Sequence, residues 1–175
     1  MYIVVGLGNP GEEYACTRHN TGRMAVAYLE KKEIKGVKLV HLDTFMNKSG
    51  NGVAKVIKSK KAADKLIVIY DDLDLGIGQM KISYNRSSGG HRGLESIIKA
   101  LKTEAFTRIR IGISPTTPSG KLKKPQGERE VEKHILGDFK KSETETLKKV
   151  FKKVVEAVEV LSEHGRERAM TEFNS

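Results

Sequence analysis

Short runs of β-branched and other apolar residues alternate along this chain with segments whose apolar residues recur at helical spacing. Strands are predicted at 2–5, 38–42, 65–70, 78–84 and 107–113, and helices at 22–32, 49–61, 94–101 and 142–164. The chain contains no internal repeat. This order of elements predicts an α/β protein in which helices cover a sheet.

Size and composition predict one domain over residues 1–175. The chain has 175 residues, of which 38% are hydrophobic, enough apolar material for a core. No apolar run approaches the ~20 residues of a membrane-spanning helix, and the N-terminus lacks the basic region of a signal peptide. We therefore expect a cytoplasmic protein without membrane contact. The only cysteine, Cys16, excludes an intramolecular disulfide.

The net charge of +10 is distributed over both halves of the chain. A surplus of cations attracts polyanions, which makes nucleic acid a candidate partner. In the strand predicted at 107–113, three isoleucines alternate with Arg108 and Arg110. This two-residue period predicts one face in the core and one solvated, basic face.

The C-terminal part of the sequence predicts a loop and then a long helix. Residues 114–130 contain three of the four prolines and several lysines, which favours a mobile loop. Ser142 and Glu145 have the spacing of a capping box and predict the start of the last helix. Gly165 is predicted to end it.

Residues 6–11, with the sequence GLGNPG, formally match the glycine fingerprint of dinucleotide-binding proteins. That fingerprint requires a helix to begin at the third glycine and receive a pyrophosphate. Here Pro10-Gly11 is a turn dipeptide, and Glu12 and Glu13 follow where the phosphates would lie. A dinucleotide site is thus a minor alternative, and the glycines favour a turn that holds Asn9 at the carboxyl end of a strand.

His19 lies in a polar stretch before the first predicted helix, and Asp71 follows the strand at 65–70. Parallel strands end at the same edge of a sheet, so Asp71, Asn9 and His19 are expected to meet there. A neutral imidazole can take a proton from water near pH 7 when a carboxylate holds its other nitrogen. The three residues therefore predict a hydrolytic site.

Three other segments allow more than one interpretation. Asp71, Asp72 and Asp74 resemble part of a cation loop, but the sequence LGIG that follows lacks the remaining ligands, so we expect no metal and a solvated turn at Asp72 and Asp74. Residues 45–50 form either a plain helix cap or, through Phe45, a surface that stacks on a nucleotide. Residues 89–93 form either a turn or a backbone cradle for a phosphate.

Taken together, these motifs closely resemble those of bacterial peptidyl-tRNA hydrolases. They occur in the family's order and extend over about residues 2–140. The motifs are VGLGNPG at 5–11, Tyr14, TRHN at 17–20, TFMNKSG at 44–50, DDLD at 71–74, GGH at 89–91, RIRIGI at 108–113 and ILG at 135–137.

The resemblance implies a single-domain, three-layer α/β fold, with a mixed, twisted sheet between helices, like that of peptidyl-tRNA hydrolases. It implies a monomeric esterase, without metal or cofactor, that cleaves the bond between peptide and tRNA and frees the tRNA. His19 matches the catalytic base, Asp71 the acid that orients it, and Asn9 the residue that recognises a peptide-blocked ester. Tyr14, Phe45 and Asn47 match substrate-binding positions.

Two features depart from the family pattern. Arg92 stands where the family has a substrate-binding asparagine, and it is retained here as a candidate substrate contact because a guanidinium can clamp a phosphate or a ribose. The segment between His19 and Phe45 is shorter than in typical members, which predicts fewer strands. These departures leave open the alternative of a tRNA- or RNA-binding relative with weakened catalysis. Candidate phosphate contacts are Arg86, Arg108, Arg110, Lys121, Lys123, Lys124 and Lys133.

Overall fold

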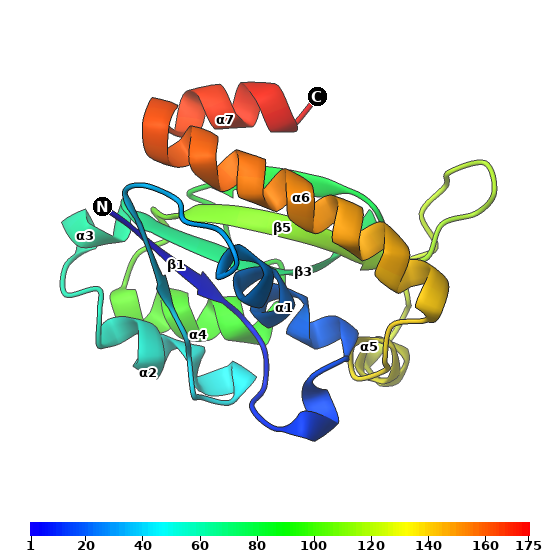
Figure 1. Cartoon of the computed structure of the whole chain (residues 1–175). Helices are drawn as coiled ribbons and strands as arrows, with labels where there is room; N and C mark the ends of the chain where they lie inside the picture. Colours follow the sequence, from blue (N-terminus) through cyan, green and yellow to red (C-terminus); the bar gives the residue numbers. More distant parts are fainter.

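A computed structural model describes all 175 residues, which build one five-stranded sheet with the order β2-β1-β3-β5-β4 (Figure 1). Four strands are parallel, and β4 runs antiparallel to β5. The strands are β1 Tyr2–Gly6, β2 Val37–Val40, β3 Leu66–Gly76, β4 Met80–Tyr84 and β5 Thr107–Ser114. The helices are α1 Thr21–Leu29, α2 Ser49–Ala54, α3 Lys60–Ala63, α4 Arg92–Leu101, α5 Glu128–Ile135, α6 Lys141–His164 and α7 Arg166–Phe173.

Helices cover both faces of the sheet and enclose two apolar cores. On one face α1, α6 and α7 pack on residues such as Val4 and Ile67. On the other face α2, α3 and α4 pack on Val5 and Val68, the next residues along the same strands. Figure 1 shows α6 and α7 on one side of the sheet and α2 and α4 on the other. This arrangement confirms the predicted three-layer α/β fold with a mixed sheet.

The helix predicted at 49–61 is in fact two short helices, α2 and α3. The second of them starts at its own N-cap, because the side chain of Ser59 accepts a hydrogen bond from Ala62 N at 3.0 Å. The remaining predicted helices and strands are present, with ends shifted by a few residues except at β3, which extends beyond its predicted end at 70 to Gly76.

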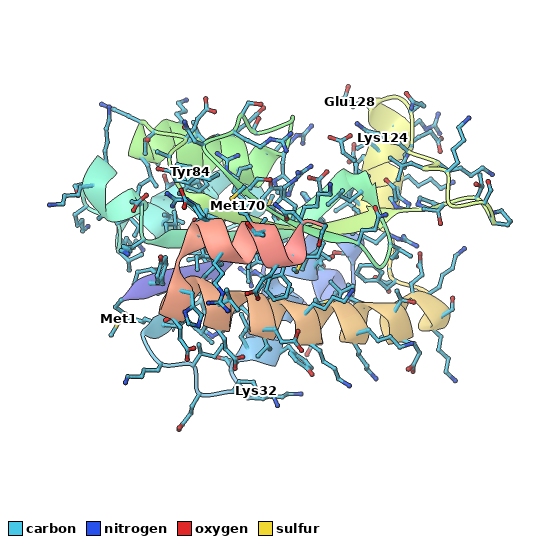
Figure 2. All side chains as sticks on the ribbon, turned by 90° about the horizontal axis from the view of Figure 1, so that it is seen from above. Met1, Lys32, Tyr84, Lys124, Glu128 and Met170 are labelled. Carbon is cyan, nitrogen blue, oxygen red and sulfur yellow. The ribbon has the colours of Figure 1, made fainter.

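The last long helix, α6, does not begin at the predicted capping box. It starts at Lys141, and Glu143, not Glu145, accepts a hydrogen bond from the backbone nitrogen of Lys140 at 2.8 Å. Glu143 also forms an ion pair of 2.9 Å with Arg18, a contact that no local pattern encodes. A further helix, α7, follows Gly165, and Figure 2 shows it, with Met170, near Tyr84 at the end of β4.

Strand β5 lies between β3 and β4, and all eight of its residues are buried. The predicted two-residue period is present, but the prediction of a solvated basic face was wrong. Arg108 is fully buried over the ring of Phe106, at 4.4 Å, and donates to the carbonyl oxygens of Ser87 and Glu104. A central strand has both faces covered, so its arginines must find partners inside the protein.

Of the residues predicted as a loop at 114–130, Ser114 ends β5, residues 115–127 form a loop, and residues 128–130 begin α5. An isolated bridge between Thr116 and Leu122 closes part of this loop. None of the helices is both long and apolar enough to span a membrane.

Candidate active site

A cavity of about 800 Å³ opens at the carboxyl edge of the sheet. β1 ends there at Gly6, which pairs in register with Ile69, and the parallel strand β3 continues beyond this point to Gly76. The loop after β1 and the second half of β3 therefore contribute to the same cavity. All seven site residues predicted from the sequence line it: Asn9, Tyr14, His19, Phe45, Asn47, Asp71 and Arg92.

His19 and Asp71 form a buried hydrogen-bonded pair at this edge. His19 lies in a 3-10 turn, Arg18–Asn20, directly before α1, and its Nδ1 is 2.8 Å from Asp71 Oδ2. The predicted position of Asp71 after its strand was wrong, because β3 continues to Gly76 with an irregularity after Asp72. The predicted meeting of the two side chains is confirmed.

The contact between His19 and Asp71 favours a protonated imidazole and an ionised carboxylate. Burial lowers the pKa of His19, but the charge of Asp71 and its hydrogen bond outweigh burial, so that this pKa is raised above its ordinary value of 6.5. Burial also opposes ionisation of Asp71, yet the charges and hydrogen bonds of His19 and His91 hold the pKa of Asp71 far below its usual range. Asp71 is therefore a carboxylate at neutral pH.

His91 is a site residue to which the sequence analysis gave no catalytic role. Its Nε2 lies 2.9 Å from Asp71 Oδ1, so the two histidines bind different oxygens of one carboxylate. The ring of His91 also packs on Tyr70, with 5.0 Å between centroids. The position of His91 just before α4, at the same sheet edge, was a signal that could have suggested this contact.

These three residues are also the only group in the structure with the composition and spacing of a metal site. One ligand atom each from His19, Asp71 and His91 lie within 4.8 Å of one another. In the structure both carboxylate oxygens of Asp71 are hydrogen-bonded, one to His19 at 2.8 Å and the other to His91 at 2.9 Å.

Asn9 has a fixed side-chain orientation. Its Oδ1 accepts a hydrogen bond from Met46 N at 2.7 Å. A backbone N–H can only donate, so the atom facing Met46 is the oxygen, and Nδ2 is the side-chain donor that remains free. Since Asn9 lines the cavity, it can offer this donor to a bound carbonyl.

Aromatic side chains form part of the cavity rim. Phe45 is 53% exposed, and its ring meets that of Tyr14 edge to face, with 6.5 Å between centroids. Phe45 also directly precedes a 3-10 turn, Met46–Lys48, that leads into α2. The predicted exposed aromatic residue is thus present, whereas no side chain caps this turn or α2, which does not support the helix-cap interpretation of residues 45–50.

The acidic residues after Asp71 have separate cationic partners. Asp72 pairs with Arg110 at 2.7 Å and is largely buried, which corrects the prediction that it is solvated. Asp74 is exposed and pairs with Lys124 at 2.5 Å. The three carboxylates therefore do not converge on one cation site.

Arg92 faces α5 across the cavity. It is the first residue of α4, its side chain is 71% exposed, and it lies 3.8 Å from Glu128. Figure 2 shows Glu128 and Lys124 close together on one side of the molecule. The positive charge of Arg92 acts on His19 by lowering its pKa, against the larger effect of Asp71.

The glycine-rich turn at 6–11 packs closely against α1 and is not followed by the α-helix that a dinucleotide fingerprint requires. A Cβ atom at Gly6 would lie 2.0 Å from the carbonyl oxygen of Gly22 in α1. Gly11 has a φ of 106° and leads into a 3-10 turn, Glu12–Tyr14, instead of an α-helix. These contacts support the predicted turn that holds Asn9.

The predicted phosphate contacts divide into two groups. Arg86 and Lys124 are exposed and line the cavity, and Lys121, Lys123 and Lys133 are exposed nearby in sequence. Arg108 is fully buried, so the prediction that it contacts phosphate was wrong, and Arg110 is mostly buried against Asp72.

Comparison with known proteins gives a consistent result. The family model described as peptidyl-tRNA hydrolase matches residues 3–39 and 30–175. The peptidyl-tRNA hydrolase of Thermoanaerobacter sp. (strain X514) is 39% identical over 194 residues, which cover 99% of this chain and 100% of the relative. That of Thermotoga maritima is 40% identical over 189 residues, which cover 99% and 97%. The crystal structure of peptidyl-tRNA hydrolase from Acinetobacter baumannii superposes with a TM-score of 0.85 at 29% identity and covers 100% of this chain and 95% of that one.

These alignments also locate a deletion. The first spans 194 positions although the chain has 175 residues, so at least 19 positions of the relative have no counterpart here. The two matched segments of the family model overlap at 30–39, between α1 and the end of β2. The family match is thus interrupted between His19 and Phe45, where the sequence predicted a shortened segment. From its family-model match and its full-length similarity to these relatives, the chain is a member of the peptidyl-tRNA hydrolase family.

Proposed function

We propose that this chain hydrolyses the ester bond between peptide and tRNA in peptidyl-tRNA, using a water molecule activated by His19, and so returns tRNA to use. The observation that carries this proposal is the buried His19–Asp71 pair, with 2.8 Å between Nδ1 and Oδ2, in a cavity that Asn9 also lines. Family membership supplies the substrate class.

His19 acts as the general base through its Nε2. Because Nδ1 donates to Asp71, the neutral ring has its lone pair on Nε2. This nitrogen takes a proton from water as the water oxygen attacks the ester carbonyl carbon. The bond to the ribose oxygen then breaks, and the proton on Nε2 passes to that oxygen. Asp71 keeps the ring in this tautomer and stabilises the transient imidazolium.

Asn9 recognises the substrate beside this base. Its free Nδ2 donates to the amide carbonyl oxygen on the α-nitrogen of a peptide-blocked ester, where an unblocked ester has an ammonium group that cannot accept a hydrogen bond. Asn47 lines the same cavity and adds amide hydrogen-bonding capacity. Donors placed in this way also polarise a carbonyl in the transition state.

The rim binds the end of the tRNA. Phe45 and Tyr14 offer aromatic faces on which an unstacked terminal base packs. Arg92 and Arg86 are exposed on the cavity wall and are suited to ribose or phosphate contacts. The net charge of +10 favours approach of the polyanion.

We further propose that the chain works as a monomer in the cytoplasm and needs no metal or cofactor. The monomer is what the family resemblance described above implies. Size-exclusion chromatography with light scattering tests this part, and a dimer mass would contradict it.

The alternative of an RNA-binding relative with weakened catalysis is not favoured by the family comparisons. One assay separates the two functions: hydrolysis of N-acetyl-aminoacyl-tRNA, measured beside the unblocked aminoacyl-tRNA. We expect rapid cleavage of the blocked ester only. Salt-sensitive tRNA binding without turnover would overturn the proposed activity.

A further inference from the structure

Asn20 directly follows the proposed base, His19, in sequence, yet its side chain binds the backbone of Asn9. It is only 3% exposed. Its Nδ2 donates to the carbonyl oxygen of Asn9 at 2.9 Å, and its Oδ1 accepts from the backbone nitrogen of Asn9 at 2.8 Å. One side-chain amide thus binds both backbone polar groups of a residue eleven positions away.

These two bonds are the backbone restraint on Asn9. In the turn after β1, Leu7 still bonds to Ile69 and Arg23 through its backbone, but Asn9 forms no backbone–backbone hydrogen bond. Pro10, which follows, has no N–H to contribute. The peptide groups around Asn9 would otherwise be free to rotate at the edge of the cavity.

The side chain of Asn9 is restrained separately, by Met46 N on Oδ1 at 2.7 Å. Two independent clamps therefore hold one residue: Asn20 fixes the backbone and Met46 fixes the side-chain plane. Together they leave a single polar atom of Asn9, Nδ2, without a partner inside the protein.

We infer that Asn20 is a positioning residue, which fixes Asn9 so that Nδ2 meets the carbonyl of a peptide-blocked ester. This inference rests on the role proposed above for Asn9. Asn20 touches no substrate and acts only through Asn9. Selectivity for blocked over unblocked esters then depends on Asn20 as well, because small misplacement of a contacting group weakens transition-state binding.

The chain contains a matched control for this contact. Asn174, after α7, donates through Nδ2 to the carbonyl oxygen of Ile82 at 2.8 Å and accepts from its backbone nitrogen at 2.8 Å. Neither Asn174 nor Ile82 lines the cavity. The substitution Asn174→Ala removes the same two hydrogen bonds at the edge strand β4, away from the proposed chemistry.

The test compares Asn20→Ala, Asn9→Ala, the double variant and Asn174→Ala. kcat and KM are measured on N-acetyl-aminoacyl-tRNA and on the unblocked ester. We expect Asn20→Ala to lower kcat/KM for the blocked ester by roughly 10- to 100-fold and to reduce the selectivity ratio. Asn174→Ala keeps wild-type values. In the double variant the losses do not multiply, because Asn20→Ala misplaces the Nδ2 group of Asn9 and Asn9→Ala has already removed that group.

Wild-type selectivity in Asn20→Ala, or losses that multiply in the double variant, would overturn the positioning role. Asn20→Asp serves if the alanine variant does not fold: it keeps the acceptor for Asn9 N but sets an oxygen against Asn9 O, so the same loss of selectivity is expected. If Asn9→Ala itself keeps full selectivity, the proposed role of Asn9 fails. If only Asn9→Ala loses selectivity, the inference about Asn20 fails alone.

Discussion

His91 Nε2 binds Asp71 Oδ1 at 2.9 Å, the carboxylate oxygen that His19 leaves free. Asp71 therefore accepts one imidazole on each oxygen and is almost completely buried between them. Two donors compensate for the cost of burying its charge, and they fix the carboxylate plane against which His19 is oriented.

The substitution Asp71→Asn tests the value of that charge. An amide offers one acceptor in place of two and lacks the charge that raises the pKa of His19. We expect kcat to fall by about 10²- to 10⁴-fold, the usual range for loss of general base assistance. Single-turnover hydrolysis of N-acetyl-aminoacyl-tRNA measures the effect, and a loss below threefold would refute the assigned role.

The substitution His19→Ala should have a similar effect on rate in a chain that still folds, with a lower free energy of unfolding because buried Asp71 loses one of its two donors. It removes the only group placed to accept the proton of water, so a loss of roughly 10²- to 10⁴-fold in kcat is expected. His41→Ala is the matched control, because His41 is exposed and pairs with Glu30 outside the cavity. Equal activity of the two variants would sink the mechanism.

The pH dependence follows from the raised pKa of His19. The base must be neutral, so kcat/KM should increase with pH through a value above 6.5. The stability from the His19–Asp71 pair has the opposite dependence: it is fully present below pH 6.5 and is lost as pH rises through the folded pKa. Rate profiles and urea unfolding between pH 5 and 9 measure both trends, and a rate that falls over this range contradicts the assignment.

Replacing Arg92 is expected to shift the pH profile of kcat/KM. Its charge lowers the pKa of His19, so Arg92→Asn should move the rising limb of kcat/KM to higher pH. Arg92→Lys keeps the charge and should leave the limb in place. The prediction fails if the asparagine variant shifts the limb toward lower pH or not at all.

Replacement by alanine should lower the free energy of unfolding at Arg108 but not at Arg86. Arg108 is buried, so its loss leaves the carbonyls of Ser87 and Glu104 without donors and should cost about 2–4 kcal/mol in unfolding free energy. Arg86 is exposed and lines the cavity, so Arg86→Ala should leave stability unchanged. Urea unfolding distinguishes the two variants, and equal losses would contradict the difference in burial.

Arg86→Ala should instead weaken tRNA binding. Removing one phosphate contact reduces the slope of log affinity against log salt by about 1. Fluorescence titration of tRNA at several salt concentrations measures the slope. An unchanged slope would show that Arg86 binds no phosphate.

The sequence by itself determined the layers of the fold and the place of the site. Two-residue and helical periods are local properties, so they predicted the strands and most of the helices. Because parallel strands point toward one edge of a sheet, the order and direction of β1 and β3 were enough to predict that His19, Asp71 and Asn9 meet, although Asp71 lies within β3 and not after it.

Only the tertiary structure decided which side chains satisfy one another. The period of β5 is the same for an edge strand and for a central one, so it could not show that Arg108 is buried. Likewise, His91 binds Asp71 from 20 positions away and Asn20 binds Asn9 from 11. Such contacts depend on how distant segments pack, and local periodicity carries no information about them.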